Sequence, residues 1–445
     1  MDTEVRKLDF KLAYILIGVL AAAAMTMLPL KYSVLLIAGA GFAVFTFFKL
    51  EISFGMFISV MACAPHEYWN NMLIVLGALF YAGVYAIQYF SGKRKGMDLK
   101  YLAPSLIVYV FFCIVSLFIG FGGMDSVRVF AILFGCIIIS VLFINIISTK
   151  EYFDMAVKMI TIAITLSALL GIYRYMAGIE IKSEFVDLTK SQGLSRLYSV
   201  MANPNNDAEF WVMLLPFSIA SAFITKSDVK RLFIGGMIVI CLAALMLTYS
   251  RAGYIALMGA AGIFILLTAP RLVPVCILLF IMLIPFIPSS IVDRLLTVGK
   301  DTSSKYRFFI WEGSINMVKD YWVQGIGMGP SAFSTIYRGY ANRSALNAMH
   351  AHNVLLNVWV ETGIGGFIAL LAYLIKTLKA GVSAFYHGED KLVKFYSAAA
   401  VSSFGAFFIF SMVEYVWYYP RVMLCFWLIS AMAFSLHKIN GGKRA

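Results

Sequence analysis

The sequence predicts an all-α, polytopic membrane protein with about 12–14 transmembrane helices. Of its 445 residues, 61% are apolar and 13% are charged, and the mean hydropathy is +0.86. Soluble domains average roughly 45–50% apolar and about 25% charged residues, so the composition excludes a soluble one-core enzyme, a disordered chain and a disulfide-stapled secreted domain. The apolar runs are continuous rather than alternating, which favours helices over a membrane β-barrel.

A helix needs about 20 predominantly apolar residues to cross a bilayer. Fourteen runs approach that length, and the number falls to twelve if the shortest of them, 51–65, and a neighbour are wrongly divided. The predicted spans are 10–28, 32–48, 51–65, 71–90, 101–120, 126–148, 156–176, 208–225, 231–249, 253–268, 272–289, 353–376, 394–413 and 420–437.

The positions of Lys and Arg predict the orientation, because basic residues gather in cytoplasmic loops. With the N-terminus inside, the inner segments hold 21 of the 36 basic residues, and both termini are cytoplasmic. The long segments 174–206 and 290–351 are then extracytoplasmic. The first apolar run lacks a signal-type cleavage site and is expected to be retained. The net charge of +13 is not gathered in a soluble basic helix or a zinc finger, so we expect no nucleic-acid partner.

Four regions differ in their polar content. Residues 1–150 form an N-terminal transmembrane scaffold with almost no polar group inside a span. Residues 151–289 add helices with an outer N-P-N and an outer S-R-A-G segment, and 290–351 form an extracytoplasmic loop. Residues 352–445 form the C-terminal helices, which begin at an H-A-H-N segment and contain E-T-G. Ionisable groups at membrane depth are costly to bury and usually mark a functional site, which places the chemistry in the second half.

Arg251 stands in a turn so short that its guanidinium is held at the outer interface, where it can grip a lipid phosphate or merely extend to the headgroups. Residues 306–320 carry apolar side chains at three- and four-residue spacing, which predicts an amphipathic surface helix with Arg307 in its first turn. Gly327 lies among the alternating glycines of 325–330, whose amides can approach an anion or simply form a flexible turn.

The segment that begins at His350 is the most informative. Asn353, Asn357 and Glu361 follow at four-residue steps and predict one polar stripe on an apolar helix, below His350 and His352. At roughly 1.5 Å per residue, Glu361 lies about 13 Å below His352, so its charge needs an arginine or a proton. The stripe indicates either a site or a buried network that holds helices together.

The sequence disfavours a catalytic metal. The two histidines supply at most two ligands, and the Asp207 and Glu209 side chains diverge on a helix. We also expect no cofactor, since no nucleotide-binding pattern is visible.

Several motifs in linked order resemble the O-antigen ligase and polymerase superfamily of bacterial membrane glycosyltransferases. They are TYSRAGYIAL, YRFFIWEGSINMVKDYWVQGIGMGPSAF, HAHNVLLNVWVETGIGGFIALL and VEYVWYYPRVMLCFWLI. The earlier stretch LYSVMANPNNDAEFWVMLLPF, with Asn203 and Asn205, is similar to the family's N-P-N region, and the resemblance covers roughly residues 195–437. The predicted number of spans exceeds the usual twelve or so.

The resemblance implies a GT-C-like fold in the bacterial plasma membrane with an extracytoplasmic site. Such enzymes transfer a glycan from undecaprenyl diphosphate to a hydroxyl of a glycan, a lipid or a protein, and the lack of a C-terminal soluble domain disfavours a protein acceptor. Carried over from the family, Arg251 and Arg307 meet the diphosphate and His352 is the base. The predicted substrate-binding residues are Arg251, Arg307, His350, Asn353, Glu361, Asn203, Asn205 and Gly327.

The alternative is a transporter or flippase of lipid-linked sugars that uses Glu361 or Glu414 for proton coupling. A transporter would need polar and charged residues along both halves of the membrane, whereas here they gather at the predicted outer half.

Overall fold

The computed structural model describes residues 30–101, 103–179, 196–283 and 302–441, together with residues 18, 19, 285, 292 and 299. Within these residues the chain is helical and contains no strand, which confirms the predicted all-α class. The predicted span 10–28 lies outside the described residues except at positions 18 and 19.

Every other predicted span coincides with a helix over its described residues. Ten helices are long and apolar enough to cross a membrane, and three shorter apolar helices accompany them in the described part of the chain. The helices are α2 (Leu30–Phe48), α3 (Leu50–Cys63), α4 (Met72–Phe90), α5 (Pro104–Ile119), α6 (Gly123–Ile146), α7 (Lys150–Met176), α8 (Pro204–Ile224), α9 (Asp228–Leu247), α10 (Arg251–Thr268), α11 (Val273–Leu283), α13 (Thr302–Tyr321), α14 (Pro330–Tyr337), α15 (Val354–Tyr386), α16 (Lys391–Ser411) and α17 (Pro420–Ile439).

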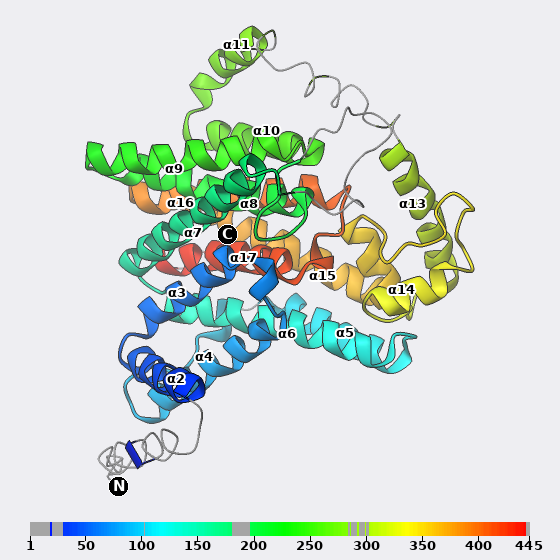
Figure 1. The fold of residues 1–445 in the computed structure, drawn as a ribbon, viewed down its shortest axis with the longest axis horizontal. Coiled ribbons are helices and arrows are strands. Elements are labelled where there is room, and N and C mark those ends of the chain that lie inside the picture. The colour runs from blue at the N-terminus through cyan, green and yellow to red at the C-terminus, as the bar shows by residue number, and fades with distance from the viewer. Residues whose placement is uncertain are drawn as a thin grey trace.

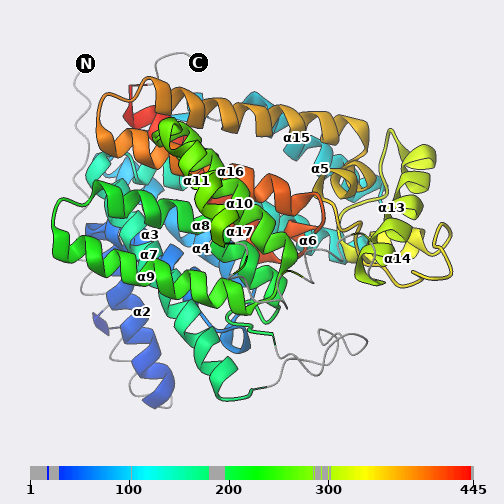
Figure 2. The ribbon, with the colours of Figure 1, turned by 90° about the horizontal axis from the view of Figure 1, so that it is seen from above.

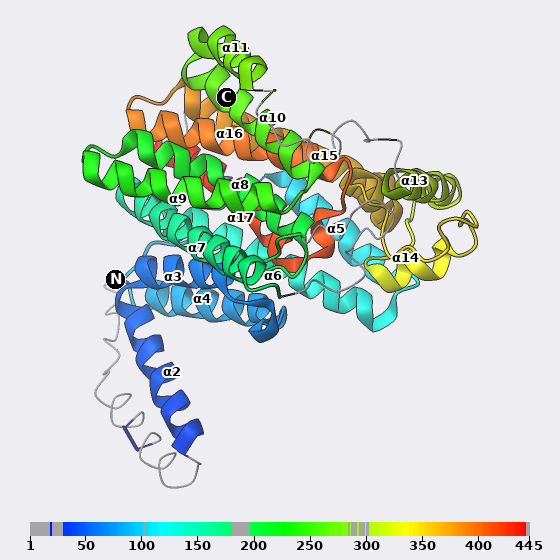
Figure 3. The ribbon, with the colours of Figure 1, turned by 45° about the horizontal axis from the view of Figure 1, so that its top comes forward.

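Most of these helices run side by side along the long axis of the molecule, and α13 and α14 cover one end of the bundle (Figures 1 and 2). The helices α8 and α17 form its centre, since 78% and 83% of their apolar windows are buried. In contrast, α2 diverges from the bundle, as Figure 3 shows, and only 11% of its window is buried. An apolar helix so exposed is suited to contact with lipid.

The chain crosses back and forth, so that the starts of α4, α6, α8, α10, α15 and α17 lie at the end covered by α13 and α14. We call this the loop end. Backbone bonds tie its connections together: Phe121 N donates to Ile326 O at 2.9 Å, and Leu197 N donates to Leu247 O at 2.9 Å. The motifs singled out in the sequence, which are far apart along the chain, therefore share one end of the bundle.

Three helices at the loop end begin in the same way. Ala202, Tyr249 and His352 adopt φ values of 57°, 51° and 48°, and they are the non-glycine residues with positive φ in the described part of the chain. Each immediately precedes an N-cap residue whose side-chain oxygen accepts a bond from a backbone amide of the first turn. These caps are Asn203 on α8, Ser250 on α10 and Asn353 on α15. Left-handed non-glycine residues concentrate at functional sites, where the surroundings hold the strain.

The helix α15 is interrupted at Gly363, whose φ of 69° and ψ of −175° are accessible essentially to glycine alone. At this kink Ile364 N donates to Trp322 O at 2.8 Å, and Ile326 N donates to Val360 O at 2.9 Å. The kink thereby lets the chain after α13 pair with the backbone of α15.

We expect Gly363→Ala to lower the thermal stability of the purified protein in detergent. The new Cβ would lie 1.9 Å from the carbonyl oxygen of Val323, and the conformation itself costs about 1–3 kcal/mol for a residue with a side chain. The control is Gly262→Ala in α10, where a Cβ would meet nothing within 4 Å. Equal unfolding midpoints for the two variants would contradict this account of the kink.

Candidate active site

The centre of the candidate site is a charged cluster of His352, Glu414 and Arg307. The Nδ1 atom of His352 lies 2.7 Å from Oε1 of Glu414, and Nη2 of Arg307 lies 3.3 Å from Oε2 of the same carboxylate. His352 immediately precedes the cap of α15, Glu414 follows α16, and Arg307 projects from α13. Since α13 begins at Thr302, Arg307 stands in its second turn, and the predicted first-turn position is wrong.

Glu414 is buried, and burial alone would raise its pKa. The charge and hydrogen bond of His352 and the charge of Arg307 outweigh that effect and hold the pKa of Glu414 well below its usual range. The carboxylate is therefore ionised and can only accept hydrogen bonds. It follows that Nδ1 of His352 carries the proton in this contact and that Nε2 is left as the basic nitrogen.

His350 packs beside this cluster. Its ring centroid lies 4.1 Å from that of His352 and 4.6 Å from that of Tyr418, and its Nδ1 accepts a bond from the amide of His352 at 3.3 Å. Burial and the neighbouring His352 lower the pKa of His350 to about 3, so its ring is neutral at physiological pH. A neutral ring here supports the position of His352 without adding a competing charge.

His350, His352 and Glu414 also offer ligand atoms that lie within 4.8 Å of one another, so these three residues could hold a metal ion. The guanidinium of Arg307 already pairs with the same carboxylate, and its positive charge opposes a bound cation. The expectation of a site without metal therefore remains a prediction.

Asn203, Asn205 and Arg251 lie in a second group, where α8 and α10 begin. Arg196 joins the two helix starts, because it donates to the Thr248 carbonyl at 2.8 Å and to Oδ1 of Asn205 at 2.7 Å. Arg251 is the first residue of α10, directly after the Ser250 cap, and is partly exposed. The short turn predicted around it is confirmed, since α9 ends at Leu247.

The two groups meet through the 415–419 segment. Nδ2 of Asn203 donates to the hydroxyl of Tyr419 at 3.3 Å, and the preceding Tyr418 packs against His350. Asn353 adds a further tie, since its Nδ2 donates to the Met412 carbonyl at 3.1 Å. The N-termini of α8 and α15 thus contact the segment that carries Glu414, and the N-terminus of α10 is joined to that of α8 through Arg196; helix N-termini favour bound anions.

Glu361 and Gly327 are engaged within the protein. The carboxylate of Glu361 accepts bonds from Gly329 N at 2.9 Å and from the Tyr415 hydroxyl at 3.1 Å, while its carbonyl accepts from Gly327 N at 3.1 Å and from Ser116 Oγ at 2.8 Å. The amide of Gly329 does meet a carboxyl group, but that group belongs to the protein itself, and the amide of Gly327 meets a backbone carbonyl. This pattern favours the structural alternative for the polar stripe over direct contact with a substrate.

Asn357, another residue of the polar stripe, is also engaged within the protein. Its Oδ1 accepts a bond from the amide of Ala351 at 2.8 Å. That bond fixes the backbone between the two histidines. The stripe therefore positions the histidine segment, and it does so from inside α15.

Sequence reasoning missed the central role of Glu414. It placed this residue near the outer end of a span, but no spacing links it to His352, which is 62 positions away. Arg196, Tyr415 and Tyr418 were also missed. An acidic residue between two apolar runs, in a segment rich in tyrosine, is the signal that was available.

Among the described residues, the buried Asp, Glu, Arg and His side chains all lie near the loop end. They are Arg174, Asp207, Glu209, His350, Glu361, Glu414 and Arg421. Two of them stabilise backbone near the site: Asp207 accepts from the amides of Ser199 and Met201, and Arg174 donates to the Ser199 carbonyl. Within the described ranges, the buried ionisable groups, which are the costliest to bury, thus gather near the loop end.

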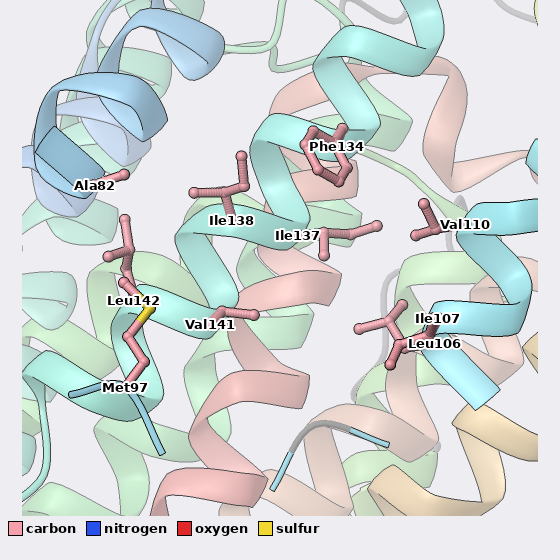
Figure 4. A pocket seen from close by; sticks show the side chains of 10 residues that line it. All are labelled: Ala82, Met97, Leu106, Ile107, Val110, Phe134, Ile137, Ile138, Val141 and Leu142. Carbon is pink, nitrogen blue, oxygen red and sulfur yellow. The ribbon is translucent and has the colours of Figure 1, made fainter. Parts of the chain in front are cut away.

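One cavity, of about 440 Å³, lies away from the loop end and is lined by apolar side chains of α4, the first half of α5, the second half of α6 and Met97, as Figure 4 shows. It offers no group that could orient a glycan or a phosphate. Another cavity, of about 370 Å³, lies at the loop end, and both polar and apolar residues line it. No histidine lines this cavity, but Tyr418 in its wall contacts the ring of His350.

We expect acid to destabilise the protein through His350. Its folded pKa of about 3 lies below the ordinary 6.5, so the unfolded chain binds a proton that the folded one rejects once the pH falls below 6.5. The contribution of the neutral His350 ring to stability is fully present above pH 6.5. Below that pH the free energy of unfolding falls by at most about 1.4 kcal/mol per pH unit. The unfolding midpoint between pH 7.5 and 5 should decline less in His350→Asn than in wild type. The exposed His387→Asn is the control, and an unchanged slope in His350→Asn would refute the assignment.

Comparison with known proteins agrees with this arrangement. Residues 236–371 match the family model described as O-Antigen ligase. The matched segment includes the start of α10 with Arg251, the helix α13 with Arg307 and the histidine segment at the start of α15. No curated protein matches the chain. The family match over this segment supports the resemblance of the chain to the O-antigen ligase/polymerase superfamily.

Proposed function

We propose that this multi-pass membrane protein transfers a glycan from undecaprenyl diphosphate to an acceptor hydroxyl at the outer face of the bacterial plasma membrane, without a metal. The family match supports a glycosyl-transfer role of the ligase or polymerase type. The observation that carries the finer proposal is the contact of His352 and Arg307 with the single buried carboxylate of Glu414.

In this proposal His352 is the general base. Glu414 accepts the Nδ1 proton, which directs the unprotonated Nε2 toward the acceptor hydroxyl. As Nε2 takes the hydroxyl proton, the oxygen forms a bond to the anomeric carbon, and the bond from that carbon to the diphosphate oxygen breaks with its electron pair. The Glu414 carboxylate then stabilises the imidazolium that His352 becomes.

The leaving undecaprenyl diphosphate gains negative charge as this bond breaks. Arg307 uses one of its five donors for Glu414, so others remain to meet an oxygen of the leaving group. Arg251 and the helix N-termini around it supply further positive potential from the other side. Fixed cationic groups of this kind stabilise developing charge without reorganising.

The charges at the opposite end support an outward direction of the loop end. Lys150 pairs there with Asp390, Lys158 with Asp154 and Arg231 with Asp228, in the segments where the positive-inside rule places the cytoplasm. This supports an extracytoplasmic position for His352.

The transporter alternative lacks comparable support. A proton-coupled carrier needs ionisable groups through both halves of the membrane, whereas the buried ones in the described ranges stay near the loop end. Formation of a glycosidic product by purified protein without a gradient would exclude it. Movement of lipid-linked sugar without a product would favour it instead.

We expect Arg251→Ala, Arg307→Ala and His352→Ala each to reduce glycan transfer by about 100-fold or more, because each removes a base or a fixed positive charge. The assay follows undecaprenyl diphosphate release and the new product by mass spectrometry, with lipid-linked glycans from the bacterium that makes this protein. Arg338→Ala, an exposed arginine of the same long loop, is the matched control. Wild-type rates in a correctly folded variant would remove that residue from the site.

Removal of metal should leave transfer unchanged. We expect the same rate before and after EDTA treatment, and no stoichiometric metal in the purified protein by elemental analysis, because Arg307 supplies the positive charge beside Glu414. Loss of activity on chelation, restored by a divalent cation, would assign a metal to His350, His352 and Glu414.

A further inference from the structure

The cavity of about 370 Å³ is lined in part by residues that the proposed chemistry does not use. Asn71 stands at the start of α4, Asp125 and Arg128 stand in the first turns of α6, and Tyr418 and Tyr419 precede α17. Its volume falls within the roughly 300–1,000 Å³ of small-molecule sites. All these elements start at the loop end, so the cavity opens on the same side as the histidines.

We propose that this cavity binds a sugar unit of the acceptor glycan, next to the sugar whose hydroxyl faces His352. The inference rests on the proposed glycosyl transfer and extends it to the site that recognises the acceptor. No residue of α8 or α10 lines the cavity, and Tyr419 in its wall accepts a bond from Asn203 at the start of α8, so the cavity adjoins the region assigned to the donor diphosphate.

The aromatic walls fit a pyranose ring. Tyr418 and Tyr419 meet edge to face, with centroids 5.0 Å apart and planes at 79°, and both are partly exposed. Tyrosine offers an apolar ring for the C–H face of a sugar and a hydroxyl for its oxygens. Tyr418 also contacts His350, and His350 contacts His352, so adjoining rings lead from the cavity to the base.

The polar walls keep hydrogen-bonding capacity for a ligand. Asn71 uses Oδ1 to accept from Trp69 Nε1 at 2.9 Å, which leaves its Nδ2 to donate. Asp125 uses Oδ2 to accept from Ser331 N at 3.2 Å, which leaves Oδ1 to accept. Arg128 is exposed and makes no ion pair within the described residues.

These donors and acceptors indicate a polyhydroxylated ligand. Sugar hydroxyls both donate and accept, and so match a mixture of amide, carboxylate and guanidinium groups. One carboxylate beside one guanidinium gives no net charge, which disfavours a phosphate as the occupant.

The cavity is held in shape by the turn before α6. Ser126 Oγ donates to the Met328 carbonyl, and Phe121 N donates to Ile326 O at 2.9 Å. A Cβ on Gly120 would lie 2.3 Å from the Cα of Gly327, so the two chain segments touch backbone to backbone. Walls fixed in this way bind a ligand without first paying to become ordered.

The test measures binding separately from transfer. Oligosaccharides released by mild acid from membranes of the bacterium that makes this protein are added to detergent-purified His352→Ala, and saturation-transfer NMR detects bound sugar. We expect binding to fall at least about tenfold when Arg128→Ala or Tyr418→Ala is added. It should persist with Tyr418→Phe, which keeps the ring, and with the control Arg338→Ala.

Absent binding by His352→Ala, or equal binding by all variants, would overturn the subsite. A transfer assay on the otherwise wild-type protein gives a second reading: Arg128→Ala should raise the KM for the acceptor about tenfold and leave the KM for the donor and kcat unchanged. If transfer occurs and Arg128→Ala alters neither KM, the subsite is wrong and the glycosyltransferase stands. If the binding pattern appears but no transfer product forms, the subsite stands and the proposed function is wrong.

Discussion

The buried carboxylate of Glu414 is the interaction on which the site depends. It contacts His352 from the start of α15 and the guanidinium of Arg307 from α13, and neither of these has another charged partner of opposite sign among the described ion pairs. The single carboxylate fixes a proton on Nδ1 of His352 and links α13 to the bundle. The loop that carries Arg307 is thereby coupled electrostatically to the histidine segment.

The fold was largely predictable because its signal is long and repetitive. Apolar runs of about 20 residues admit few alternatives in a membrane, and each predicted span in the described ranges is a helix. Details controlled by a few atoms were not predictable. The interruption at Gly363 depends on a close approach by the Val323 carbonyl, and nothing in the sequence around Gly363 distinguishes it from the neighbouring glycines.

The site was predictable where its residues are neighbours in sequence. His350, His352 and Asn353 form one motif, and the four-residue stripe to Glu361 indicated a shared helix face. The sequence could not say that this stripe turns inward to hold the glycine loop, because that depends on partners 32 and 54 positions distant. Pairing of charges across α13 and α16 is a property of tertiary packing, and periodicity carries no information about it.

The contacts of Arg421 determine when the loop end can be completed during synthesis. From the start of α17 it donates to the carbonyl of Ala64, after α3, and to that of Val200, before α8. Ribosomes deliver these three points in sequence, and the arginine emerges last. A nascent chain therefore lacks the brace that joins its early and middle helices until its final helix has been inserted. Assembly is completed from the C-terminal side, so an incompletely translated chain would lack the contacts that close its loop end.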